Sequence, residues 1–339
     1  MLRQICYAKK EDKPAGAAGI SDRGIALILV LWVVVLMSMA ALSLSLLTRT
    51  EALATLSFKE ELEYKFLAEA GIQRGVMELL FRQANRDQQS ILEGSEPYQC
   101  DGRAYEAEIS GGRFRIRIME ESGKINLNAL TDESGTVLKN LLVNSGVAED
   151  RAAVIVDSIL DWKDEDNLHR LSGAEDEYYQ SLRKPYKAKN AEFDSLEELA
   201  FVRGVTGDIL HGSRERGERK GILSFCTVFA KGDKINLNTA PPEILKAIPG
   251  MMDDMIRRIL AYRDLGPAEK ALETSRWTDA EYAAIAPYVT TAESNVFTID
   301  ATGYRDNDKR HYAVRATVAI EGAQKYRILY FQSPSTAGS

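Results

Sequence analysis

Histidine, cysteine and catalytic motifs are scarce in this chain. Its 339 residues include only three histidines and three cysteines. His169, His211 and His311 do not have the spacing of metal ligands, so we interpret them as surface or hydrogen-bonded core residues. No Gly-x-Ser-x-Gly motif, histidine pair on a helix or phosphate-binding loop occurs either. The sequence therefore predicts that the protein is not an enzyme.

The chain also lacks an excess of basic residues. Lys and Arg number 43 against 50 Asp and Glu, a net charge of −7. Residues 1–24 hold five basic and three acidic side chains, which leaves 38 basic and 47 acidic residues and a net charge of −9 in the remainder. General nucleic-acid binding needs a basic face, so we expect no nucleic-acid partner.

Long uncharged apolar runs are absent with one exception, residues 25–47. As a helix this run would be roughly 35 Å long, enough to cross a hydrocarbon core of about 30 Å. It is longer than the apolar region of a signal peptide, and no Ala-x-Ala-like site follows it, which favours a retained anchor. Basic residues precede it, so we expect a single-pass protein with a cytoplasmic N-terminus and an exported body.

The junction before this run resembles the cleavage site of type IV prepilins, because Arg23-Gly24 directly precedes the apolar residues. The resemblance implies that a prepilin peptidase cuts between Gly24 and Ile25, that the new terminus is methylated, and that the helix stays in the bacterial inner membrane. Most pilins carry Glu at the fifth mature position, where it pairs with a neighbour's terminal amine. Leu29 occupies that position here. A subunit without this carboxylate fits poorly inside a filament but could sit at its end.

Helical periodicity continues beyond the membrane run, so we expect one helix over 25–84, spanning the membrane at 25–47 and bent near Gly71 and Gly75. Its exported half should pack an apolar stripe on a sheet. The stripe that the spacing predicts consists of Leu53, Leu56, Leu62, Phe66, Ala70 and Met77.

Period-two alternation predicts strands over 103–109 and 113–120, joined by a Gly111-Gly112 turn. Similar alternation returns at 223–230, 296–304, 312–320 and 326–331, whereas residues 121–221 have a helical pattern. These patterns predict an α+β fold, in which a long N-terminal transmembrane α-helix packs on an antiparallel, pilin-like sheet. A large α-helical insertion interrupts this sheet.

The helical part contains a short internal sequence repeat. Residues 124–128, Lys-Ile-Asn-Leu-Asn, recur as residues 234–238. The second copy precedes a helix-hairpin-helix pattern that turns at Gly250, and Gly146 and Gly204 mark weaker versions.

Helix-hairpin-helix units often bind DNA phosphates through turn amides and nearby cations. Asp253 and Asp254 beside the third turn would repel phosphate, although Arg257 and Arg258 follow them. We favour a structural use of these hairpins. The alternative is a membrane-tethered DNA-binding receptor, which a salt-dependent DNA-binding assay would distinguish.

Carboxylates crowd an irregular segment that follows a predicted helix ending at Asp161. Asp164 and Asp166 lie in this segment, and Glu175 and Asp176 follow a glycine further on. Calcium prefers six to eight oxygen ligands, mixing carboxylates and backbone carbonyls. From composition alone, a calcium site and a solvated acidic loop are equally well supported.

Two cysteines lie in the exported part, where disulfides can form. Cys100 and Cys226 each flank a predicted strand, whereas Cys6 lies in the leader. A Cys100–Cys226 bridge and two separate buried thiols are both open.

Taken together, these residues resemble the K-type minor pseudopilins of type II secretion systems. The resemblance rests on the junction at Gly24, on Leu29, on segments 161–166 and 173–176, and on Ile-Asn-Leu-Asn-Thr-Ala-Pro-Pro at 235–242. It implies a pilin-like body with a large helical insertion, and calcium bound within that insertion. The ligands it implies are Asp161, Asp164, Asp166, Glu175 and Asp176.

The same resemblance implies partners and a role. It places such a subunit in a complex with I-type and J-type minor pseudopilins, at the tip of a periplasmic filament of major pseudopilin. The filament supports export of folded proteins across the outer membrane. The expected organisation is a leader (1–24), the long helix (25–84), a pilin-like body (85–121, 222–235 and 290–333), a helical insertion with the acidic metal loop (122–221), a helix-hairpin-helix-like segment (236–289) and a disordered tail (334–339).

Overall fold

The computed structural model describes residues 22–85, 98–109, 111–212, 220–265, 277–306 and 310–335, the side chains of 22–24 excepted. The predicted leader up to residue 21, and the predicted tail from residue 336 onward, lie outside the described residues. The chain divides into two units, residues 1–60 and 61–339.

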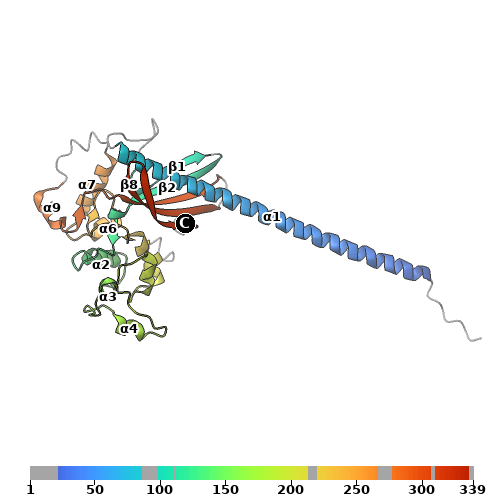
Figure 1. Ribbon diagram of the computed structural model, residues 1–339, viewed down its shortest axis with the longest axis horizontal. Helices are drawn as coiled ribbons and strands as arrows, with labels where there is room; N and C mark the ends of the chain where they lie inside the picture. Colours follow the sequence, from blue (N-terminus) through green and yellow to red (C-terminus); the bar gives the residue numbers. More distant parts are fainter. Residues whose placement is uncertain are drawn as a thin grey trace, which may run out of the picture. The chain divides into compact units, whose positions relative to one another are not determined.

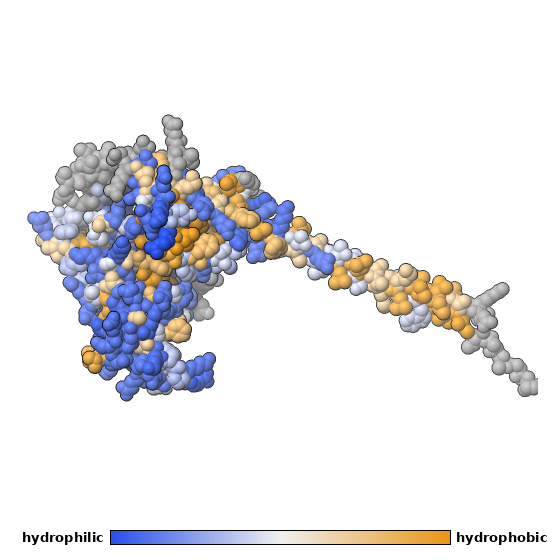
Figure 2. All heavy atoms as spheres, viewed as in Figure 1, coloured by the Kyte–Doolittle hydropathy of each residue, from blue (hydrophilic) through white to orange (hydrophobic). Residues whose placement is uncertain are grey.

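Helix α1, Asp22–Ala84, is the single long helix that the periodicity predicts. In the first unit its apolar side chains from Ile25 to Leu47 are exposed, which Figure 2 shows as an orange surface along the helix. Within the described ranges, α1 is the one helix long and apolar enough to span a membrane. Leu29 lies on this exposed surface.

The second unit contains a five-stranded sheet with the order β1-β2-β7-β8-β9, in which every neighbouring pair is antiparallel. The predicted hairpin forms the first two strands, and Gly111 at its turn has the positive φ of +74° that favours glycine. The sheet then continues with strands from the C-terminal end of the chain. The strands are β1 (Asp101–Ile109), β2 (Gly112–Glu120), β7 (Val296–Tyr304), β8 (His311–Gly322) and β9 (Lys325–Gln332).

The part of α1 from residue 61 onward packs across one face of this sheet (Figure 1). The buried helix positions recur at three- and four-residue spacings and contact inward-facing residues of β2 and β7 such as Ile116 and Ile299. The predicted stripe is wrong at this point, because Leu62, Phe66 and Met77 are exposed. The helix carries two apolar stripes, and the sheet covers the one formed by Tyr64, Ala68, Ile72, Val76 and Leu79.

Gly71 and Gly75 lie in this interface, and the helix runs through both. A Cβ atom on Gly71 would lie 3.0 Å from the Ala301 side chain, and one on Gly75 would lie 3.1 Å from that of Ile299. These glycines therefore allow close packing of helix and sheet.

The remaining elements build a second core of buried apolar residues, separate from that of the sheet. Leu138, Leu141, Ile155 and Ile159 are fully or almost fully buried in it. Its α-helices are α2 (Gly135–Asn144), α3 (Glu149–Lys163), α4 (Asp176–Gln180), α5 (Gly207–His211), α6 (Pro242–Ala247), α7 (Asp253–Asp264) and α9 (Asp279–Ile285). Among the described residues, the second unit also contains three 3-10 turns, η1 (Glu121–Gly123), η2 (Leu196–Phe201) and η3 (Ile222–Ser224), and four two-residue strands.

The sequence repeat at 124–128 and 234–238 corresponds to a repeated structure. Strand β3 (Ile125–Asn126) pairs in parallel with β4 (Cys226–Thr227), and β5 (Ile235–Asn236) pairs in parallel with β6 (Val289–Thr290). Asn126 donates its side-chain amide to the carbonyls of Ala230 and Gly232, just beyond the partner strand.

Asn236 repeats this bond in the second copy, where its amide donates to the carbonyl of Ala292. In each copy the asparagine Oδ1 also accepts a hydrogen bond from the backbone two residues on, at Asn128 or Asn238. The repeated asparagines therefore close two structurally equivalent helical modules.

One predicted strand is wrong. Residues 223–230 were expected to join the large sheet, but their regular structure is limited to β4, which pairs with β3. Phe225 and Cys226 are buried in the helical core. The alternation correctly marked buried side chains, but these side chains pack against helices.

The glycines of the three predicted hairpins adopt the left-handed backbone that a tight turn requires. Gly146, Gly204 and Gly250 have φ values of 86°, 84° and 80°. Gly146 connects α2 to α3, and Gly250 connects α6 to α7. The identity of these units as helix-hairpin-helix modules stays a prediction.

Candidate metal centre in the acidic loop

Helix α3 positions the first two carboxylates of the site. Asp157 and Asp161 are four residues apart, so they lie on one face of the helix one turn from each other. The helix ends at Lys163, whose ammonium group donates to the carbonyl of Asn128, and Asp164 already has an extended backbone. The loop that follows therefore starts beside the carboxylates of α3.

The loop returns to α3 through backbone hydrogen bonds. The backbone N–H of Arg170 donates to Asp161 Oδ2 at 3.1 Å, and that of Ser172 donates to Asp157 Oδ2 at 3.0 Å. Gly173 lies so close that a Cβ atom there would be 1.8 Å from Asp161 Oδ2. A glycine is therefore required at residue 173 for this approach of loop and helix.

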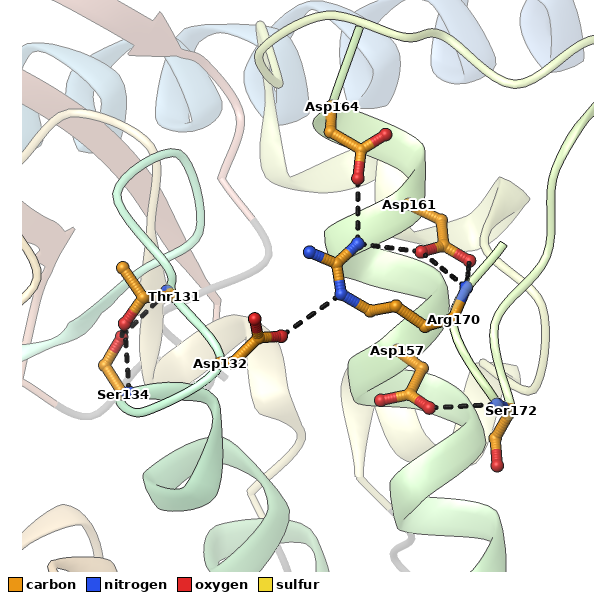
Figure 3. A network of polar contacts seen from close by, with 8 residues as sticks. All are labelled: Thr131, Asp132, Ser134, Asp157, Asp161, Asp164, Arg170 and Ser172. Atoms are coloured by element: carbon orange, nitrogen blue, oxygen red, sulfur yellow. Dashed lines mark hydrogen bonds and ion pairs between the residues drawn. The ribbon is translucent and has the colours of Figure 1, made fainter. Parts of the chain in front are cut away.

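Arg170 lies between three carboxylates, as Figure 3 shows. Its Nη1 atom is 2.8 Å from both Asp161 Oδ1 and Asp164 Oδ2, and its Nε atom is 3.1 Å from Asp132 Oδ1. Asp161 is fully buried, and burial raises the pKa of its carboxyl group while the bonds from Arg170 lower it. Arg170 thus supplies the counter-charge for a carboxylate that water does not reach.

Three of the predicted ligands come together in a group that fits a metal ion. Ligand oxygens of Asp164, Asp166 and Glu175 all lie within 4.8 Å of one another. Glu175 is only 4% exposed, and neither of its carboxylate oxygens has a hydrogen-bond partner among the described residues. Asp164 Oδ1 is likewise buried and without such a partner.

The electrostatics of Glu175 agree with this geometry. Burial, followed by the neighbouring carboxylates of Asp161, Asp164 and Asp166, raises the pKa of Glu175 to about 7. An unpaired buried carboxylate is unfavourable unless a cation or a proton neutralises it. Hard cations such as calcium bind carboxylate oxygens of this kind, so the donor set fits the ion that the resemblance implies.

The other two predicted ligands are bonded elsewhere. Asp161 accepts from Arg170, as described above, and is not part of the group of three. Asp176 Oδ1 accepts from the backbone N–H of Ala188 at 2.9 Å, and its Oδ2 lies 3.5 Å from Lys187 Nζ. Both carboxylates hold the loop in shape.

Sequence reasoning missed Arg170 and Asn190 as parts of the site. Asn190 has a left-handed backbone with φ 48°, and its amide donates to the carbonyl of Asp166 at 3.0 Å. Its Oδ1 atom is buried and has no partner in the described part of the chain. Asn190 lies 24 residues beyond Asp166, so no local motif identifies it.

An aromatic cluster beneath the loop gives it a rigid support. Trp162, which directly follows Asp161 on α3, packs edge-on against Tyr179 with ring centroids 5.2 Å apart. Tyr179 is fully buried and stacks on Tyr186, also at 5.2 Å. These rings fix the end of α3 and the start of α4, which carry Asp161 and Asp176.

Cys100 and Cys226, both in the second unit, are separate buried thiols in the structure. Cys100 belongs to the sheet core and Cys226 to the helical core, and neither forms a disulfide. Burial raises the pKa of both thiols to about 12, so both stay protonated at neutral pH. The bridge that the sequence left open is therefore not formed.

The cations beside the third hairpin already have acidic partners. Arg257 Nη2 lies 3.1 Å from Asp254 Oδ1, and Arg258 Nη2 lies 2.6 Å from Glu281 Oε1. A DNA phosphate would have to compete with these carboxylates, which weakens the case for a DNA-binding surface at this hairpin.

Fold and site together define a pilin-like protein with a long apolar N-terminal helix and an added helical part that contains a metal-binding loop candidate. Residues 123–213, which include the whole loop, match the family model described as "Type II secretion system (T2SS), protein K".

Individual relatives agree with this match. The chain is 24% identical to the putative type II secretion system protein K of Escherichia coli strain K12, over 81% of this chain and 85% of that protein. It is 26% identical to the Klebsiella pneumoniae protein K over 66% of this chain and 68% of that protein. The match to the Pectobacterium carotovorum protein K is 29% identical but covers only 39% of this chain and 41% of that protein.

A solved structure has the same fold. It is described as the GspK-GspI-GspJ complex from the type 2 secretion system of enterotoxigenic Escherichia coli, and the match has a TM-score of 0.60 at 17% identity. It covers 84% of this chain and 100% of that chain. The predicted resemblance to the K-type minor pseudopilins of type II secretion systems is thereby confirmed.

Proposed function

We propose that this protein caps the tip of the periplasmic pseudopilus of a type II secretion system. Its role is assembly, not catalysis, and it supports export of folded proteins across the outer membrane. The observation that carries the proposal is that one chain combines a pilin-like helix and sheet with additional helical modules. A pilin-like unit with an apolar helix is suited to a filament, whereas the added helical modules are larger than a repeating subunit needs.

Leu29 supports the capping position. An apolar side chain there cannot neutralise the terminal amine of a neighbouring subunit, so the pairing expected inside a filament is missing. Head-to-tail stacking of subunits stays open unless one end is blocked, and a bulky head blocks addition above it. The exposed Leu53, Leu56 and Leu62 on α1 remain available for packing on helices below.

The partners we propose are the I-type and J-type minor pseudopilins, with major pseudopilin below them. The structure with the matching fold is described as a complex of K, I and J proteins, and this supports the assignment. Native mass measurement of this chain mixed with I-type and J-type proteins should show one copy of each. A stable homopolymer of this chain, or its even distribution along labelled filaments, would contradict capping.

We propose that the protein is anchored in the inner membrane by residues 25–47, with a cytoplasmic N-terminus and a periplasmic body. Prepilin peptidase would cut after Gly24, and methylation would follow at Ile25. The length and apolar character of α1 support the anchor, and the basic residues before it support the orientation.

The acidic loop is proposed to hold a structural calcium ion. Asp164, Asp166 and Glu175 would supply carboxylate oxygens, and Asn190 Oδ1 is a further oxygen beside Asp166. When bound, the ion supplies the positive charge that the buried Glu175 carboxylate lacks. The chain's own residues hold the loop for it, through Gly173 against Asp161 and through Asp176 at the start of α4.

A further inference from the structure

Arg170 forms an ion pair with one carboxylate of the proposed metal group, that of Asp164. Its Nη1 atom is 2.8 Å from Asp164 Oδ2, while Asp164 Oδ1 is buried and has no hydrogen-bond partner among the described residues. The guanidinium also contacts Asp161 and Asp132, so it spans two carboxylates of the α3 end and one of the preceding loop (Figure 3).

The clustering of acidic residues is not the only observation that points to a cation at this site, because one of the carboxylates is also buried and without a partner. Glu175 is more than nine-tenths buried, has no hydrogen-bond partner among the described residues and lies with Asp164 and Asp166 within 4.8 Å. Among the described residues, the Arg170 guanidinium makes no hydrogen bond to Glu175, and its ion pairs are with Asp161, Asp164 and Asp132.

We propose that Arg170 is a tethered counter-cation that opposes the metal and sets its affinity. The proposal rests on the calcium site proposed above. In the metal-free protein the guanidinium balances the negative charges of Asp161 and Asp164. A divalent ion bound by Asp164 and Glu175 must share Asp164 with a fixed positive charge close by.

The direction in which calcium affinity changes follows from the contacts that remain when the Arg170 side chain is replaced. The backbone N–H of Arg170 bonds Asp161 whatever the side chain, and Ser172 and Gly173 also hold the loop on α3. Loss of the guanidinium should therefore remove repulsion from the ion without removing the loop. At about 6 Å and a water-like dielectric, a unit charge weakens binding of a divalent ion by on the order of tenfold.

The test is calcium titration of the detergent-solubilised full chain, with affinity and metal-free melting temperature both measured. We expect Arg170→Gln to bind calcium about tenfold more tightly and to melt at a lower temperature without metal. Arg170→Lys keeps the charge and should stay near the wild-type affinity. Arg151→Gln is the matched control, because Arg151 lies on α3 but bonds the carbonyl of Gly204.

The outcomes separate the two proposals. No calcium binding by the wild type would overturn the metal site, and the role of Arg170 with it. Calcium binding by the wild type together with equal or weaker binding by Arg170→Gln would overturn only the role of Arg170. Equal tightening in the Gln and Lys variants would also overturn it, because charge would not be the cause.

A measurement on the wild type covers the case in which Arg170→Gln fails to fold. Calcium should shift the NMR signals of the Arg170 guanidinium group, since its Nη1 atom shares Asp164 with the ion. The Arg151 signal should not move. An Arg170 signal that stays unchanged through calcium saturation would overturn the proposal.

Discussion

Gly303 of β7 lies directly against the backbone of α1 at Tyr64. A Cβ atom on Gly303 would be 2.1 Å from the Tyr64 carbonyl oxygen and 2.6 Å from the backbone nitrogen of Ala68. Both neighbours are backbone atoms of a helix and cannot turn aside as a side chain can. Helix and sheet therefore meet at their closest approach through a residue without a side chain.

We expect Gly303→Ala to destabilise the second unit by about 3 kcal/mol or more, because α1 must move off the sheet. Urea unfolding of the full chain in detergent would measure this. Gly207→Ala is the control, since nothing lies within 4 Å of a Cβ there. It should stay within about 1 kcal/mol of the wild type. Equal stability of the two variants would show that α1 does not pack here as described.

Periodicity predicted the elements of this fold better than it predicted their partners. Alternating residues such as Phe114, Ile116 and Ile118 correctly marked β2, because one face of that strand is buried. The same alternation near Cys226 marked residues buried against helices. A period reports which side chains avoid water, and it does not say which surface covers them.

For the candidate site, too, the sequence indicated the residues but not their contacts. From the sequence, Asp164, Asp166 and Glu175 were recognised as part of a carboxylate cluster near an irregular loop, and the family resemblance implied them as ligands together with Asp161 and Asp176. Their separation from Asp161 and Asp176 was not recognised, because it depends on bonds to Arg170 and to the backbone of Ala188. Such bonds are set by the path of the loop, which no residue pattern in the sequence specifies.

Arg258 and Glu281 predict a pH dependence in the second helical module. Their atoms approach to 2.6 Å, and the hydrogen bond from Arg258 followed by that from Thr278 lowers the pKa of Glu281 to about 2. A carboxyl group whose pKa in the folded state lies below its ordinary value of 4.5 stabilises the fold at pH values above about 4.5. This contribution should be lost as the pH falls from about 4.5 toward 2.

A double-mutant cycle with Arg258→Gln and Glu281→Gln would measure the coupling. We expect a favourable coupling energy at pH 7 that declines as the buffer is brought below pH 4.5. The pair Lys139–Glu149 on the first module, at 2.9 Å but more exposed, is a suitable comparison and should show weaker coupling. Coupling that is unchanged down to pH 2 would contradict the assignment.

Processing of the N-terminus is the next expected outcome. The chain extracted from cells that contain prepilin peptidase should have the mass of residues 25–339, with or without one methyl group. Gly24→Val should block this change, because the peptidase must approach the backbone closely. Gly16→Val changes a leader glycine away from the junction and should leave cleavage intact. Recovery of only the full-length wild-type chain would rule out the cleavage.

The last prediction tests which carboxylates bind calcium. The resemblance implies five ligands, whereas the geometry brings together Asp164, Asp166 and Glu175. Calcium bound only by the folded state should stabilise it by about 2.7 kcal/mol at one hundred times the dissociation constant, seen as a higher melting temperature. Glu175→Gln should abolish this rise, because it removes the buried charge that needs a cation. Asp166→Asn should greatly reduce it.

Asp176→Asn is the informative control. Its remaining Oδ1 atom can still accept the hydrogen bond from the Ala188 backbone, so the loop should hold its shape and the calcium response should persist. Glu175→Gln should also melt at a higher temperature than the wild type in the presence of a chelator, since it relieves the repulsion among neighbouring carboxylates. Loss of the calcium response in Asp176→Asn, with its retention in Glu175→Gln, would reverse the assignment and restore Asp176 as a ligand.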